Sequence, residues 1–150
     1  MTQLTWSFKS FKELSVTELY EILKLRNEVF VVEQNCVYLD TDDKDQQSFH
    51  LCGWLGDRLV SYVRILPPGV SYIESSIGRV VIQPGFRKNG AGKLLMQKAI
   101  QKTYMQFNCT GIRIGAQLYL LSFYTNLGFT QTSDIYLEDG ISHIEMLHSK

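Results

Sequence analysis

Residues 78–100 have the sequence GRVVIQPGFRKNGAGKLLMQKAI, and this segment decides how the rest of the chain is organised. Its β-branched run at 80–82 predicts a strand, and the residues from Ala91 onward predict a helix. Pro84-Gly85 and the basic, glycine-bearing residues 87–92 predict a turn between them. At a helix N-terminus several backbone N–H groups lack an intrahelical partner, and the helix dipole is positive. The segment therefore predicts a phosphate-binding turn.

The flanking chain predicts a mixed α/β sheet. Before the segment, alternating polarity, an S-x-x-E capping box and a Gly-Asp turn are the main signals. They predict a strand at 4–9, a helix from Ser15 through Phe30, and strands at 50–55, 59–66 and 72–82. Gly78, inside the last of these, favours a β-bulge. After the segment we expect a strand at 110–116, a helix at 118–126 that is capped by Gly128, a strand through 129–132 and 135–137, and a final strand at 143–147.

Length and composition exclude several classes of protein. At 150 residues the chain predicts a single domain, residues 1–150. Lys plus Arg and Asp plus Glu both number 15, which argues against binding to nucleic acid or an anionic membrane. Neither a signal-type apolar core nor an apolar run of about 20 residues is present, so a cytoplasmic protein is expected. Cys36, Cys52 and Cys109 have no metal-ligand or CxxC spacing and are expected to be free thiols.

Charged residues in the first half allow more than one interpretation. Arg26 and Glu33 lie on or beside the apolar stripe of the first helix, so Arg26 either pairs with a carboxylate, for example Glu33, or contacts substrate. The acidic stretch at 35–48 superficially resembles a calcium loop but lacks its glycine and its final glutamate, and no metal is expected. We predict instead a solvated acidic rim, including Asp40, that attracts a cationic substrate.

Two motifs resemble a known enzyme superfamily. Arg87, Gly90 and Gly92 form an R-x-x-G-x-G signature that resembles motif A of the Gcn5-related N-acetyltransferases. Downstream, Gln117 and then the FYTNLGF segment at 123–129 resemble that superfamily's FY-x-x-x-GF segment. The stretches LRNEVFVVEQNCVYLDTDDKD, IGRVVI and HIEM look like its ElaA-like branch, and the resemblance covers nearly the whole chain. It implies an acyl-CoA N-acyltransferase fold with a mostly antiparallel, twisted sheet that splays at the cofactor site.

The resemblance also implies acetyl-CoA as the acyl donor. The backbone of residues 87–92 would bind the pyrophosphate, with local positive charge from Arg87, Lys88 and Lys93. The free edge of residues 80–82 would bind pantetheine, and the Val80 N–H would act as oxyanion donor. The implied cofactor-binding residues are Val80, Val81, Ile82, Arg87, Lys88, Asn89, Gly90, Ala91, Gly92, Lys93, Gln117 and Tyr124.

The implied reaction is direct transfer of the acetyl group to a primary amine of a small molecule or peptide within a ternary complex. Tyr124 is the candidate general acid; the alternative is a core aromatic on an amphipathic helix. The candidates for the general base are Glu33, Glu74, His50 and His143, of which Glu33 or His143 is preferred. Arg79 is expected either to form a buried ion pair or to contact the substrate. The candidate substrate-binding residues are Arg26, Glu33, Asp40, His50, Arg79 and His143.

A rival function is a non-catalytic module that binds acyl-CoA on the same fold. Tyr124 favours catalysis, since a site that has lost its catalytic activity does not need this tyrosine. A P-loop and a dinucleotide fold are excluded because GxxxxGK[ST] and GxGxxG are missing. Dimers are common on this fold, so a homodimer is a further expectation.

Overall fold

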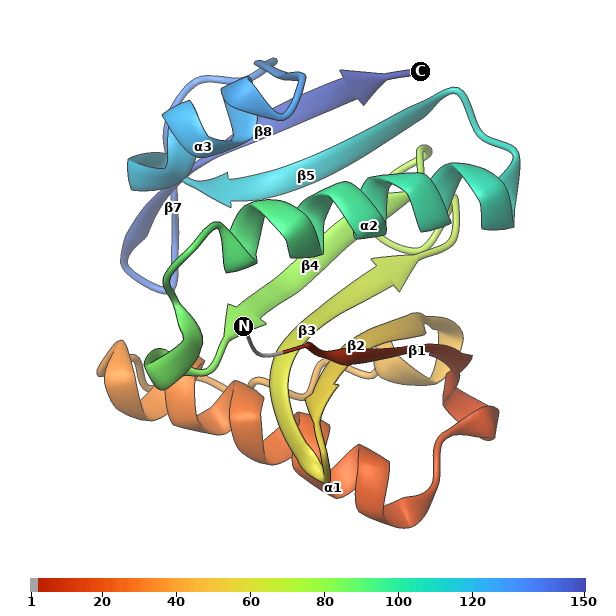
Figure 1. Cartoon of the computed structure of the whole chain (residues 1–150). Helices are drawn as coiled ribbons and strands as arrows, with labels where there is room; N and C mark the ends of the chain where they lie inside the picture. Colours follow the sequence, from red (N-terminus) through yellow and green to blue (C-terminus); the bar gives the residue numbers. More distant parts are fainter. Residues whose placement is uncertain (1–2) are drawn as a thin grey trace.

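The computed structural model describes residues 3–150, and its helices and strands follow the predicted order except in the region 129–137 (Figure 1). The strands are β1 (Thr5–Ser10), β2 (Phe49–Leu55), β3 (Arg58–Leu66), β4 (Ser76–Ile82), β5 (Gly111–Gln117), β6 (Phe129–Gln131), β7 (Tyr136–Glu138) and β8 (Ile141–Ser149). The α-helices are α1 (Val16–Arg26), α2 (Ala91–Phe107) and α3 (Leu121–Asn126). The region at 129–137 is thus two short strands, and both pair with β8.

The strands form two four-stranded sheets that meet at one point. In the first sheet the order is β1-β2-β3-β4, and in the second β8 pairs with β5, β6 and β7; all these pairs are antiparallel. Between β4 and β5 the only bridge within residues 3–150 is a parallel one from Ser75 to Ile112, where the Arg113 N–H donates to the Ser75 carbonyl at 2.9 Å. From there the two strands diverge, as Figure 1 shows. The predicted splayed, mostly antiparallel sheet is confirmed.

Two hydrophobic clusters cover opposite faces of the first sheet. Neighbouring residues of a strand point to opposite faces, so Tyr62 packs with Ile22 and Leu25 of α1, while Val63 packs with Leu95 of α2. The larger cluster continues across the junction into β5 and β8 through Ile112, Ile114, Ile144 and Met146. Because α2 packs on β3 and β4 and its cluster reaches the second sheet, it holds the two sheets together across the junction.

The C-terminal half of the first helix differs from the prediction. Its start is as expected, since the Ser15 hydroxyl accepts from the Glu18 N–H at 3.0 Å and the Glu18 carboxylate accepts from the Ser15 N–H at 2.7 Å. After Arg26, however, the chain continues as a π-helix, Asn27–Glu33, and the Gln34 N–H donates to the Val29 carbonyl at 3.0 Å. This run is rich in β-branched residues, which crowd an α-helix. The wider turn brings Val29, Phe30 and Glu33 to the cavity described below.

The strand predicted at 72–82 is shorter in the structure. Residues 72–74 belong to no strand, because β3 ends opposite Ser76 and Ser75 pairs with β5 instead. The three cysteines are free thiols, as predicted. No helix within residues 3–150 combines the length and apolarity needed to cross a bilayer.

Candidate active site

A cavity of about 970 Å³ lies in the wedge between the diverging strands β4 and β5. The π-helix, α3, the loop before β2 and the β7–β8 hairpin complete its wall. Ten of the residues singled out in the sequence line it: Glu33, Arg79, Val80, Val81, Ile82, Arg87, Gly92, Gln117, Tyr124 and His143. Eight others lie outside this lining: Arg26, Asp40, His50, Lys88, Asn89, Gly90, Ala91 and Lys93.

Strand β4 presents backbone groups to the cavity because it is the last strand of its sheet. The Gln83 N–H donates to the Val60 carbonyl at 2.8 Å, so it points toward β3. Backbone groups alternate along a regular strand, which directs the N–H group of Ile82 away from β3 and toward β5. The edge that the resemblance assigns to pantetheine therefore presents a backbone donor to the wedge.

A β-bulge shapes this edge, as Gly78 suggested. The register passes from Arg64 opposite Gly78 to Tyr62 opposite Val81, so Arg79 and Val80 together face a single residue of β3. The left-handed conformation is at Arg79, with φ of 51°, and not at the glycine. A positive φ in a non-glycine residue is strained and needs support from its surroundings. That support comes from the arginine's side chain, as described below.

The turn between β4 and α2 leaves a run of backbone donors open. None of the N–H groups from Arg87 to Lys93 donates a hydrogen bond to another group within residues 3–150. The first that does so is that of Leu94, which donates to the Gly90 carbonyl at 3.0 Å. Gly90 occupies the N-cap with φ of 75° and provides no side-chain cap. Together with the positive end of the 17-residue helix α2, these donors form an anion-binding concavity.

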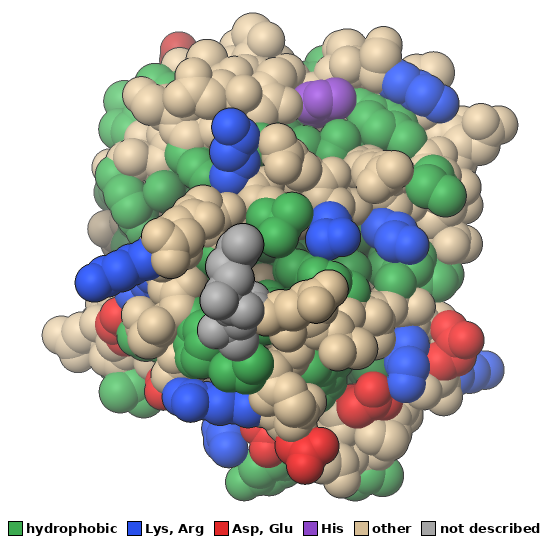
Figure 2. Space-filling model, in the orientation of Figure 1, with side chains coloured by type: hydrophobic (Ala, Val, Ile, Leu, Met, Phe, Trp, Pro, Cys, Tyr) green, Lys and Arg blue, Asp and Glu red, His purple; other side chains and the backbone are tan. Residues whose placement is uncertain are grey.

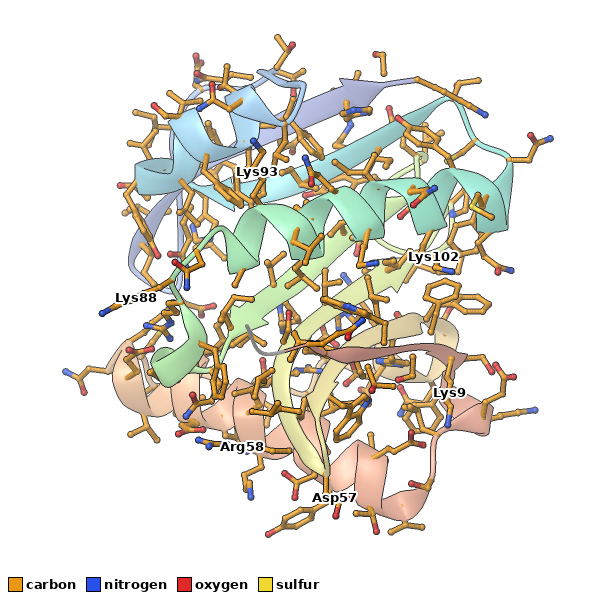
Figure 3. All side chains as sticks on the ribbon, viewed as in Figure 1. Lys9, Asp57, Arg58, Lys88, Lys93 and Lys102 are labelled. Atoms are coloured by element: carbon orange, nitrogen blue, oxygen red, sulfur yellow. The ribbon has the colours of Figure 1, made fainter. Side chains whose placement is uncertain are left out.

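Lysines contribute charge around this turn without entering the cavity. Lys88 extends outward from the turn, and Lys93 leaves α2 on the side of α3 (Figure 3). Figure 2 shows that Lys and Arg side chains are spread along the face that carries α2, whereas most acidic side chains on this face gather toward α1. The turn therefore lies on a positively charged part of the surface.

Arg87 connects the turn to the π-helix. Its guanidinium donates to both carboxylate oxygens of Glu33, with Nη1 to Oε2 at 2.7 Å, and its Nε donates to the Ile82 carbonyl at 3.1 Å. The hydrogen bond from Arg87 lowers the pKa of Glu33. As a result the Glu33 carboxylate is ionised and already engaged, which is unfavourable for a general base.

Tyr124 is both a core aromatic and a cavity residue. Only 6% of it is exposed, and its ring packs edge-on against Phe123 and Phe129, with centroids at 5.1 and 5.8 Å. Its hydroxyl makes no hydrogen bond within residues 3–150, and burial raises its pKa. The phenol therefore carries its proton at neutral pH, the state that a general acid requires.

One ring nitrogen of His143 makes a hydrogen bond, and the other makes none within residues 3–150. Its Nδ1 lies 2.7 Å from the Ile141 carbonyl, which can only accept, so Nδ1 bears the hydrogen of the neutral ring. Nε2 then carries the lone pair, and 3.6 Å away lies a carboxylate oxygen of Glu138. The ring stacks on Tyr136, with centroids 5.9 Å apart, and the residue is 6% exposed. His143 is thus an oriented, buried imidazole in the wall of the cavity.

The acidic loop is not the solvated rim that we predicted. Arg26, which is fully buried, binds Asp40 at 2.8 Å and Asp45 at 2.7 Å. Arg64 binds Asp45 at 2.9 Å and Asp42 through both carboxylate oxygens at 2.7 and 2.8 Å. Arg26 therefore pairs with these aspartates and not with Glu33. The loop folds its carboxylates inward because two buried guanidinium groups require partners, so neither Arg26 nor Asp40 has a free surface for substrate.

Arg79 joins the same ion network at the edge of the cavity. Its Nη2 donates to the Asp40 carbonyl at 2.8 Å, and its Nε lies 2.9 Å from the Asp40 carboxylate. The side chain is 22% exposed and lines the cavity. The two interpretations of Arg79 are therefore compatible, because an arginine in an ion pair also faces the wedge. Its anchored side chain holds the strained backbone next to Val80.

The other two candidate bases are engaged elsewhere. His50 is fully buried, with Nδ1 2.7 Å from the Tyr62 hydroxyl and Nε2 3.0 Å from the Asp45 carbonyl, and burial lowers its pKa. Glu74 accepts two hydrogen bonds from Arg113, at 3.0 and 2.9 Å, which lower its pKa. Neither residue lines the cavity, so neither is retained as a base.

Sequence reasoning missed several cavity residues. Tyr72, Gly115 and Glu138 also line the wedge, on the side of β5 and the β7–β8 hairpin. They come from a loop, a strand and a hairpin that are far apart in the sequence. A lone Gly115 within the predicted strand was the one local signal, since such a glycine often marks a close approach.

Comparison with known proteins agrees with the fold. Residues 17–149 match the acetyltransferase (GNAT) domain family. An acyl-CoA N-acyltransferase from Pseudomonas aeruginosa is 37% identical with a TM-score of 0.93, and Escherichia coli ElaA is 38% identical with a TM-score of 0.92; each alignment covers 98% of this chain and 100% of the other. The UPF0039 protein sll0451 of Synechocystis is 42% identical over 97% of this chain and 95% of its own length.

These similarities confirm the resemblance drawn from the two motifs, the ElaA-like branch included. Acyl-CoA N-acyltransferases of this fold use acyl donors linked to coenzyme A. The anion-binding turn, the open edge of β4 and the cavity between the two sheets are the features that such a donor requires. The chain belongs to the GNAT acetyltransferase family, in the branch that contains ElaA.

Proposed function

We propose that the protein transfers the acetyl group of acetyl-CoA to a primary amine by direct attack within a ternary complex. One observation carries the proposal: the open N–H groups of residues 87–93 lead into the cavity that is lined by Val80, Tyr124 and His143. Phosphate binding and proton transfer are thereby served by adjoining parts of one site.

The residues present fit coenzyme A. The open N–H groups from Arg87 to Lys93 would hold its pyrophosphate, because they are unpaired donors at a helix N-terminus. The β4 edge at Val80 and Ile82 would pair with the pantetheine amides as a neighbouring strand does. Gln117, at the end of β5, faces this edge across the wedge. When bound, the donor supplies an acetyl thioester with a thiolate leaving group.

Three groups of the chain would carry the proton and charge changes. The Val80 N–H donates to the acyl oxygen, on which negative charge develops during attack. The His143 Nε2, the free nitrogen of an oriented ring, accepts a proton from the attacking amine. The Tyr124 hydroxyl, which has no partner within residues 3–150, supplies a proton to the departing sulfur.

The cysteines support direct attack over a covalent acyl-enzyme. Cys52 is fully buried on the α1 face of the sheet, and burial raises its pKa to about 12, which opposes formation of a thiolate. Cys36 lines the cavity, but its Sγ lies 3.6 Å from the Asp139 carbonyl, and it makes no hydrogen bond to a basic side chain within residues 3–150. Neither thiol has the neighbouring base that a nucleophile needs.

Release of free thiol from acetyl-CoA with a panel of amines tests the proposal. We expect turnover with at least one primary amine, and in Tyr124→Phe a fall in kcat of about 100-fold. Tyr20→Phe, on the exposed side of α1, is the matched control and should turn over normally. Full activity of Tyr124→Phe would exclude the acid role, and binding of acetyl-CoA without turnover of any amine would favour the non-catalytic module.

A further inference from the structure

The β5–β8 side of the wedge carries polar groups that the proposed reaction does not use. Tyr72, Gly115 and Glu138 line the cavity there, and the β7–β8 hairpin that carries Glu138 lies beyond the end of β5, at the open end of the wedge. Tyr136 stacks on His143, and Glu145 pairs in register with Gly115. Since His143 is the proposed base, these groups lie beside the position of the acceptor amine.

The missing side chain of Gly115 makes room for two phenol groups. A Cβ at this position would lie 3.0 Å from the Tyr136 hydroxyl and 3.3 Å from the Tyr72 hydroxyl. Both hydroxyls therefore converge over Gly115, and neither makes a hydrogen bond within residues 3–150. Two half-buried hydroxyls that point to one spot without a partner can both accept from a single N–H donor group.

The charges in this region are predominantly negative. Along the rest of the wall, three arginines of the ion network balance three aspartates, and Arg87 balances Glu33. Within residues 3–150, Glu138 makes its one ion-pair contact with His143, at 3.6 Å. Glu145 lies 3.5 Å from Arg113, a residue that already binds Glu74 with two hydrogen bonds. A cation is the ligand that these two carboxylates lack.

The pKa values of the two phenols reflect the same negative charge. Burial first, and then the negative charge of nearby groups that include Glu138 and Glu145, raises the pKa of Tyr72 and raises that of Tyr136 to about 12. Lys44 is the one lysine or arginine of the cavity lining that forms no ion pair within residues 3–150, and its Nζ donates to the Ser71 hydroxyl at 2.9 Å. The hydroxyl groups and the carboxylates therefore act on one region.

Building on the proposed function, we propose that the acceptor is a small aliphatic amine with a second positively charged group, such as a diamine. The second ammonium group binds over Gly115, between the hydroxyls of Tyr72 and Tyr136 and the carboxylates of Glu138 and Glu145. The first amine faces His143. Leu66, Ile77 and Ile141 also line the cavity and provide an apolar surface for the methylene chain between the two groups.

The transfer balances without another reactant. An N–C bond forms and the thioester C–S bond breaks, so that the ammonium group becomes an amide and the coenzyme leaves as a free thiol. Overall, R–NH₃⁺ and the acetyl thioester give R–NH–COCH₃, the thiol and one proton. Of the two protons that the nitrogen loses, His143 passes one to solvent, and the other restores the hydroxyl of Tyr124, which has protonated the sulfur. The second ammonium group keeps its charge throughout.

Three acceptors of the same length test the second charge. With acetyl-CoA, we expect kcat/KM for 1,4-diaminobutane to exceed that for butylamine by at least about tenfold, because a charge-assisted hydrogen bond is gained. 4-Aminobutanoate, whose second group is anionic, should be poorer than butylamine. Equal values for the diamine and butylamine, or a preference for 4-aminobutanoate, would overturn the inference and leave the proposed function standing.

Variants locate the effect. In Glu145→Gln the ratio of kcat/KM for the diamine to that for butylamine should fall by about tenfold. Asp57→Asn is the matched control, because it removes the same charge at the β2–β3 turn, far from β7 and β8 (Figures 1 and 3). The ratio in this control should equal that of the unsubstituted protein. An unchanged ratio in Glu145→Gln would contradict the assigned position.

A binding measurement separates the two proposals. If no amine releases thiol, the proposed function fails, and calorimetric titration of 1,4-diaminobutane then decides on the cation site alone. Binding that is weakened by Glu145→Gln but not by Asp57→Asn would support the site. Binding no tighter than that of butylamine would overturn it.

Discussion

Two charged loops of this protein differ in whether their polar groups already have partners. The basic turn at residues 87–93 keeps its backbone donors open, whereas the acidic loop at 40–45 spends most of its carboxylates on buried arginines. The difference lies in whether the polar group can reach a partner within the protein. A backbone N–H at an uncapped helix start has no partner by geometry, but a carboxylate in a loop can turn inward whenever a buried guanidinium lies within reach. Open backbone is therefore a better guide to a binding site than loop charge.

The largest predicted effect is a loss of stability when the ion network of the acidic loop at residues 40–45 is broken. Asp45→Ala removes the carboxylate shared by Arg26 and Arg64, and we expect the free energy of unfolding to fall by about 3–5 kcal/mol because buried charges lose their partner. Urea denaturation measures this. Asp43→Asn, in an exposed neighbour of the same loop whose positive φ asparagine also tolerates, should change it by less than about 0.5 kcal/mol. Similar losses in the two variants would contradict the contrast between the loops.

The open turn is tested by shortening the donor. Acetyl-pantetheine lacks the phosphates that the N–H groups of residues 87–93 are proposed to bind, so its KM should exceed that of acetyl-CoA by about 100-fold or more. Once bound, it should react with a similar kcat, because the groups at Val80 and Tyr124 are unaffected. Thiol release under saturating amine gives both constants. Equal KM values for the two donors would show that the turn does not bind phosphate.

The ion pair between Arg87 of the turn and Glu33 of the π-helix provides a finer test. Because Glu33 is engaged by Arg87, Glu33→Gln should change kcat/KM for the amine by no more than a few-fold. His143→Ala, which removes the oriented Nε2, should lower it by about 100-fold. Steady-state kinetics with one amine compares the two. A larger loss in Glu33→Gln than in His143→Ala would reverse the assignment of the base.

The smallest predicted effect is a dependence of stability on acid pH. Burial tends to raise the pKa of Asp42 and Asp45, but the hydrogen bonds and charge of Arg64, and for Asp45 also of Arg26, outweigh burial and lower both. Their stabilising contribution is thus complete above the unfolded pKa of about 3.9 and is lost as pH falls below it.

Urea denaturation between pH 3 and pH 6 measures this dependence. We expect the free energy of unfolding to decline below about pH 4, and the decline to be shallower in Asp42→Asn, which lacks one of the two titrating groups. An identical slope in the variant would show that Asp42 gains nothing from its arginine in the folded protein.

Much of the fold follows from local signals in the sequence. The capping box at Ser15, the Asp139-Gly140 turn with φ of 50° and 77°, and the glycine-bearing turn before α2 each depend on a few adjacent residues. The π-helix and the short β4 depend on tertiary partners instead. No periodicity distinguishes a π-turn from an α-turn, and the start of β4 is set by where Ser75 meets Ile112.

The candidate site divides in the same way. The donor half is contiguous in the sequence, so one motif predicted it. The acceptor half brings Tyr72, Gly115 and Glu138 together through the packing of separate elements. Asp40 and Asp42 were misjudged because their partners, Arg26 and Arg64, lie on an earlier helix and a later strand, and composition alone does not pair them.

The single bridge between Ser75 and Ile112 makes the two sheets a lever. From Ile112 to Gln117, strand β5 extends by about 16 Å, so one degree of rotation about the bridge moves the Gln117 end by about 0.3 Å. The same rotation moves Gly115, three residues from the bridge, by about 0.2 Å. Substitutions that repack α2 against the two sheets would therefore alter the width of the wedge at Gln117 more than at Gly115.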